Sequence, residues 1–127
     1  MPTIPFIHLT EPQAWAIGCA CVFMLLDVVT GFVAAAINND ISSSKMRAGL
    51  GHKVALVCLI ILALMVEVAS EHIAGLGFGG VMTVTVCVYI IVMEVASVCE
   101  NICKADPDLV DAPVMKLFDH KDKGETN

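Results

Sequence analysis

Hydrophobic residues run along this chain in three long blocks separated by shorter polar tracts. The blocks extend over residues 14–37, 54–70 and 81–103. As α-helices, which rise 1.5 Å per residue, they are long enough to cross, or nearly cross, about 30 Å of hydrocarbon. Apolar runs of this length favour membrane spans over helices of a small soluble core. The pattern predicts an all-α integral membrane protein with three transmembrane helices.

Local signals mark where these helices begin and end. The segment Thr10–Gln13 (TEPQ) has the form of a capping box, which predicts a helix start. The polar tract at 38–52 predicts a short interfacial loop, with room for a short helix begun by Ser43 or Ser44. The glycine-rich run at 75–80 suits a tight turn between the second and third spans.

From Lys104 onward the composition changes to a charged segment that contains Pro107 and Pro113. This change predicts a solvated and partly disordered tail. The chain therefore divides into a transmembrane domain at residues 1–107 and a tail at residues 108–127.

The basic residues predict the orientation of the three spans. In a three-span topology all seven of them fall on one side of the membrane, and an even number of spans would divide them. The positive-inside rule makes that side cytoplasmic, with the N-terminus out and the C-terminus in. The seven residues are Lys45, Arg47, Lys53, Lys104, Lys116, Lys121 and Lys123.

Composition agrees with a membrane protein and excludes several other classes. The chain is 57% hydrophobic and 16% charged, with a mean hydropathy of +0.82. One small soluble core could not bury this much apolar surface. A net charge of −6 argues against a nucleic-acid partner. The six cysteines lie mostly in apolar runs, as small hydrophobic side chains do, and no catalytic, metal-binding or cofactor-binding spacing is present.

Ionisable residues within a span are costly and suggest a functional role. Asp27 in the first span and Glu94 in the third are expected at similar depth, because the two spans run in the same direction. Glu100 lies nearer the cytoplasmic end, at the level where the second span begins with Lys53. We expect Lys53 and Glu100 to be in contact there and to form an interfacial anchor.

Small and polar residues surround both acids at helical spacing. Gly31 and Ala35 would permit close helix packing, and Ser97 and Asn101 extend the polar stripe of the third span. The stripes predict that the polar faces of these helices meet each other or a neighbouring subunit, with apolar faces toward lipid. Asp27, Glu94, Ser97 and Asn101 would then line or gate a pore. The alternative is that they serve ordinary helix packing. The stripes are Ala20, Asp27, Gly31, Ala34, Ala35 and Asn38 in the first span, and Thr83, Cys87, Glu94, Ser97 and Asn101 in the third.

Two motifs carry a resemblance to a known family. The first is Asp27-Val-Val-Thr30-Gly31, followed by Ser43-Ser44-Lys45, Gly49 and Lys53. The second is Glu94-x-x-Ser97-x-x-Glu100-Asn101. In this order and spacing, over residues 20–107, the chain resembles the toxin-secretion and phage-lysis holin family. It departs from that family at Met93, where Asn is frequent, and in lacking a Gly soon after the Glu-Asn pair.

The resemblance implies a non-enzymatic phage protein of the bacterial inner membrane. Such a protein oligomerises among membrane lipids and opens holes that release an endolysin, which it need not contact, or in related members a toxin. Two other classes stay open from the residues alone. One is a proton or ion channel, or a transporter subunit, that uses Asp27 or Glu94. The other is a membrane anchor that recruits a partner through its tail.

Overall fold

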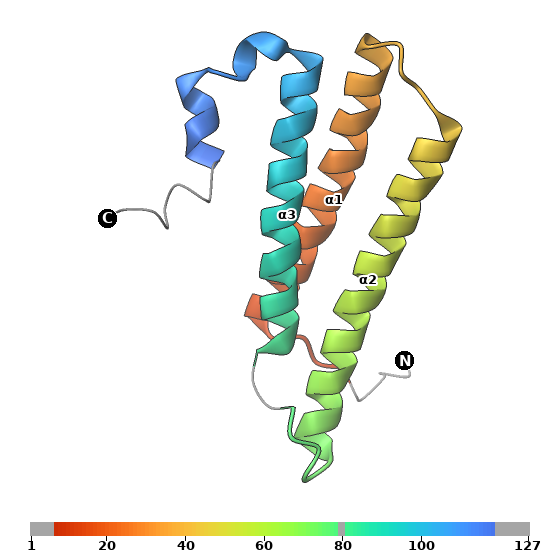
Figure 1. Ribbon diagram of the computed structural model, residues 1–127. Helices are drawn as coiled ribbons and strands as arrows, with labels where there is room; N and C mark the ends of the chain where they lie inside the picture. The colour runs from red at the N-terminus through yellow and green to blue at the C-terminus, as the bar shows by residue number, and fades with distance from the viewer. Residues whose placement is uncertain (1–6, 79–80, 119–127) are drawn as a thin grey trace.

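A computed structural model describes residues 7–78 and 81–118 of the chain (Figure 1). Its three long helices are α1 (Glu11–Ile37), α2 (Ser43–His72) and α3 (Met82–Ala105). Two short 3-10 helices follow, η1 (Pro107–Leu109) and η2 (Pro113–Phe118). The three long helices are each long and apolar enough to cross a membrane, which confirms the three predicted spans.

The three helices form a bundle in which the chain direction alternates. Gln13 near the start of α1 and Thr83 near the start of α3 both contact Glu67 near the end of α2. At the opposite end, the Asn38 side chain after α1 donates to the carbonyl oxygen of Lys104 in α3. Thus α1 and α3 are parallel and α2 runs antiparallel to both (Figure 1).

The predicted capping box opens α1. The Gln13 backbone N–H donates to Thr10 Oγ1 at 3.3 Å, and the Thr10 backbone N–H donates to Gln13 Oε1 at 2.9 Å. These bonds satisfy two donors that a helix start would otherwise leave unpaired. The helix consequently begins at Glu11 rather than at residue 14.

The predicted loop at 38–52 is wrong over most of its length. Helix α2 begins at Ser43, one of the two predicted starts, but continues without a break into the second span. The Ser42 side chain caps it, and the residues that follow include strong helix formers such as Ala, Met, Lys, Arg and Leu. These helix-favouring residues outweigh Gly49 and Gly51, which suggested a loop. Lys53 therefore lies well inside a helix and not at its start.

The predicted turn between α2 and α3 is confirmed in its described part. Gly75 and Gly77 have φ angles of 86° and 80°, in the left-handed region that glycine adopts without strain. Residues 79–80 of this run lie outside the described residues.

The first part of the tail is ordered, where the sequence predicted a partly disordered segment from residue 108. Pro107 and Pro113 begin η1 and η2, and Asp106 caps η1 by accepting from the Asp108 N–H at 3.2 Å. η2 turns back and packs against α3 (Figure 1). The end of the predicted tail, at 119–127, lies outside the described residues.

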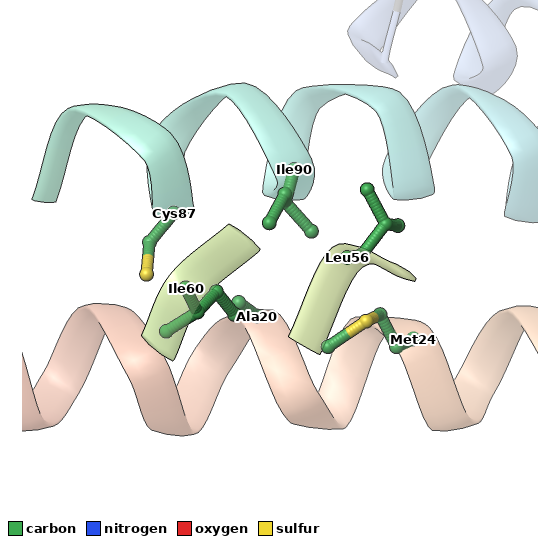
Figure 2. Close-up of a cluster of buried hydrophobic side chains, with 6 residues drawn as sticks. All are labelled: Ala20, Met24, Leu56, Ile60, Cys87 and Ile90. Carbon is green, nitrogen blue, oxygen red and sulfur yellow. The ribbon is translucent and has the colours of Figure 1, made fainter. Parts of the chain in front are cut away.

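The core is a small cluster to which all three helices contribute (Figure 2). Cys87 is completely buried in it, so this thiol packs as a hydrophobic side chain, as predicted. α1 and α3 pack along most of their length, whereas α2 packs mainly on α3. Large apolar side chains on the outer faces are exposed, as lipid-facing side chains of a membrane bundle would be. The cluster consists of Ala20, Met24, Leu56, Ile60, Cys87 and Ile90.

Candidate functional site

One residue from each long helix meets at a buried group of charges. Lys53 Nζ lies 2.7 Å from Asp27 Oδ2 and 2.5 Å from Glu94 Oε2. The Glu94 side chain is 2% exposed, and those of Asp27 and Lys53 are 15% and 14% exposed. We call Asp27, Lys53 and Glu94 the ion cluster.

The helix directions bring these three side chains together. α1 and α3 are parallel, so Asp27 and Glu94 lie at the same level, which confirms the predicted similar depth. Because α2 begins at Ser43, Lys53 lies several turns into the helix, at the level of Asp27 and Glu94. The long lysine stem can follow apolar surface while its ammonium group reaches both acids.

The predicted Lys53–Glu100 contact is wrong. Glu100 Oε1 lies 3.1 Å from Lys104 Nζ on the next turn of α3, and the Glu100 side chain is 66% exposed. Lys53 instead lies deeper, at the level of Glu94. Attraction between opposite charges is stronger at a buried position than at an exposed one, because the effective dielectric constant is lower there.

Asn101 holds the second oxygen of Asp27. Its Nδ2 atom lies 3.0 Å from Asp27 Oδ1, 3.2 Å from the Asp27 carbonyl oxygen and 3.1 Å from Thr30 Oγ1. Lys53 contacts Oδ2, so both carboxylate oxygens have donors. A Cβ placed on Gly31 would lie 3.4 Å from Asn101 Nδ2. Gly31 therefore lies where the Asn101 side chain of α3 approaches α1 closely.

The ion cluster has an odd number of charges. With both acids ionised its formal charge is −1, and a single proton on either acid makes it neutral. A charge in a membrane span is costly unless it is paired and hydrogen-bonded, as these side chains are. The arrangement can thus hold three helices together in lipid, and it would expose two acids if the helices separated.

A cleft of about 950 Å³ opens beside the ion cluster. It lies toward the end of the bundle that carries the 38–42 connection, where α2 leans away from α3 (Figure 1). Its walls mix apolar and polar side chains from all three helices. The predicted site residues Asp27, Gly31, Ala35, Lys53, Glu94, Ser97, Glu100 and Asn101 all line it.

A second polar cluster lies near the other end of the bundle. Glu67 is 6% exposed, and its Oε2 atom accepts from Thr83 Oγ1 at 2.5 Å and from Gln13 Nε2 at 2.7 Å. We call Glu67, Thr83 and Gln13 the Glu67 cluster. No role was predicted for Glu67, although it is an acid within an apolar run, the same signal that singled out Asp27 and Glu94.

The cysteines and the remaining acids and histidines form neither a disulfide nor a metal site among the described residues. All six cysteines are free thiols. Among residues 7–78 and 81–118, no group of three or more His, Cys, Asp or Glu side chains is arranged to hold a metal ion.

The chain matches the model of the bacteriophage holin family over residues 10–118. The chain belongs to this family. The match covers all three spans and both 3-10 helices, and it confirms the resemblance carried by the two motifs. Holins are not enzymes, and this one is a multi-pass membrane protein with three spans. Searches of curated proteins and of solved structures gave no significant match.

Proposed function

We propose that this holin oligomerises in the inner membrane of a bacterial host and opens holes that release an endolysin to the cell wall. The observation that carries the proposal is the ion cluster, which keeps two acids paired between three apolar helices. Family membership supports the lytic role, and the endolysin would pass through the hole without a specific contact.

In the proposed resting state the polar faces of α1 and α3 cover each other within one chain. Asp27 is bound by Lys53 and Asn101, and Glu94 is bound by Lys53. A water-filled hole needs these faces to be exposed, so opening requires the ion cluster to break. Hydration of the separated charges would then offset part of the lost pairing. Asp27 and Glu94 are the proposed gate residues, with Ser97 and Asn101 as lining residues beside them.

Self-association would use the same face of α1 that packs against α3 within a single chain. Gly31 and Ala35 lie on the small-residue face of α1, beside the cleft. In the open state they would let a helix of another copy approach as closely as Asn101 of α3 does in the closed chain.

The proposed orientation is N-terminus out and C-terminus in. Its support is the distribution of charge, because the five basic residues in the described ranges lie toward the end of the bundle that carries the 38–42 connection. They are Lys45, Arg47, Lys53, Lys104 and Lys116.

Induced expression in bacteria tests the proposal, with release of a cytoplasmic protein-sized reporter as the measurement. We expect normal growth at first, followed by abrupt reporter release once the protein has accumulated in the membrane fraction. Intact membranes at high expression would overturn the lytic function. Selective, pH-dependent ion flux without reporter release would instead favour a channel. Loss of all function on deletion of residues 108–127 would favour an anchor, since a holin should keep hole formation with altered timing.

A further inference from the structure

The segment after α3 exposes a group of large apolar side chains. Val110, Val114, Leu117 and Phe118 are 56%, 50%, 73% and 52% exposed. Side chains three residues apart align in a 3-10 helix, so Val114 and Leu117 share one face of η2, and Phe118 follows on the next face. A solvated tail would leave this apolar group in water, which is unfavourable.

The position of the segment relative to the membrane explains this exposure. η1 begins almost immediately after α3, which is long and apolar enough to cross a bilayer. η2 then turns back and contacts α3 instead of extending away from it (Figure 1). The segment is therefore held beside the last turns of α3. With α3 across a bilayer, this position would lie near the lipid headgroups.

The polar residues of the segment fit that boundary. Asp106, Asp108, Asp111 and Lys116 are all exposed, so the segment combines a polar surface with an apolar one. Short amphipathic segments of this kind lie in the plane of a membrane surface, with the apolar side chains among the lipids. Three acids against one lysine exclude attraction to anionic lipids as the driving force, which leaves apolar burial.

We propose that residues 106–118 form a C-terminal anchor, in which the apolar face of η2 inserts into the lipid surface beside α3. The ligand is the bilayer itself, with no preference for anionic headgroups. The anchor fixes the depth of the C-terminal end of α3. This inference depends on the membrane placement of α3 and not on hole formation, so a failed lysis experiment would leave it standing.

Tryptophan fluorescence of the full-length protein in phosphatidylcholine vesicles tests the anchor. The chain has one tryptophan, so Trp15→Phe provides a silent background. In that background, Leu117→Trp reports on the apolar face of η2, and Lys116→Trp is the matched control on a neighbouring, polar position. We expect Leu117→Trp to show blue-shifted emission, strong quenching by lipids brominated near the headgroup, and several-fold weaker quenching by aqueous acrylamide than Lys116→Trp. Val114→Trp, on the same face, should behave like Leu117→Trp.

Three results would overturn the anchor. Equally strong acrylamide quenching at all three tryptophan positions would mean that the tail is solvated. Protection that disappears when vesicles carry a single copy each would mean that the face contacts another protein copy. Protection that appears only with phosphatidylglycerol in the vesicles would mean electrostatic recognition instead of apolar burial. Circular dichroism of each variant checks that the helical bundle has formed.

Discussion

Lys53 Nζ lies 2.5 Å from Glu94 Oε2, across the contact between α2 and α3. The same nitrogen lies 2.7 Å from Asp27 on α1, so one ammonium group joins three membrane spans. Each ion pair is strong only while the helices keep water away from it. The stability of the closed bundle and the onset of hole formation should therefore respond together to changes at this position.

Removal of the cation should destabilise the closed chain. Lys53→Met keeps an apolar stem but leaves Asp27 and Glu94 without their shared partner. Loss of one member of a buried ion pair costs about 3–5 kcal/mol. We expect a loss of this size in unfolding experiments in detergent micelles, and earlier reporter release in cells. The control is Lys45→Met, whose pair with Asp40 is exposed and should contribute at most about 1 kcal/mol. Equal behaviour of the two variants would count against the ion cluster.

Charge exchange distinguishes the observed partner of Lys53 from the predicted one. Lys53→Glu and Glu94→Lys should each impair the protein, whereas the double variant restores one cation between two acids. We expect a favourable coupling energy of about 1–3 kcal/mol between the two changes, measured by a double-mutant cycle. Lys53→Glu combined with Glu100→Lys leaves three acids together and should show no rescue. Rescue by the Glu100 exchange alone would contradict the geometry.

Gly31 should tolerate only a very small side chain. A Cβ there lies 3.4 Å from Asn101 Nδ2, so Gly31→Ala needs a small adjustment, whereas Gly31→Leu pushes α3 away from α1. Overpacking of this kind costs about 1–3 kcal/mol. Gly18→Leu is the control in the same helix, because nothing lies within 4 Å of a Cβ at Gly18. Thermal unfolding in micelles should separate Gly31→Leu from both other variants.

The Glu67 cluster should stabilise the opposite end of the bundle. Glu67→Ala leaves the Thr83 hydroxyl and the Gln13 amide without their acceptor. An unpaired buried polar group costs about 1–3 kcal/mol, and we expect at least that loss in micelle unfolding. The nearby exposed acid Glu71 supplies the control as Glu71→Ala. A Glu67→Ala protein as stable as the control would show that these hydrogen bonds contribute nothing.

Much of this fold was predictable because lipid imposes a simple rule on the sequence. Long apolar blocks give the spans, and the small and polar stripe around Asp27 and Glu94 identifies the faces that meet. The partner of Lys53 was not predictable in the same way. Glycines at 49 and 51 suggested a loop, and only the actual helix start at Ser43 fixes the level that Lys53 reaches.

The tail and Glu67 show a second limit of sequence patterns. A charged composition predicted a solvated and partly disordered tail, whereas its first part forms two 3-10 helices, in which residues three apart share a face. Glu67 was visible as an acid in an apolar run, yet its partners come from the starts of two other helices. Contacts of this kind depend on how helices are placed side by side, which one chain's composition does not encode.

The two ends of the bundle differ because the cleft lies toward only one of them. Near Glu67 all three helices are joined by hydrogen bonds, whereas at the other end α2 leans outward and contacts α1 little (Figure 1). Helix α2 could therefore rotate about its end at Glu67, with Lys53 about 21 Å away along the helix. A small rotation about this end becomes a displacement of several ångströms at the ammonium group, enough to part both ion pairs in one movement. Opening of the bundle, as proposed above, would then begin at the end that carries the 38–42 connection.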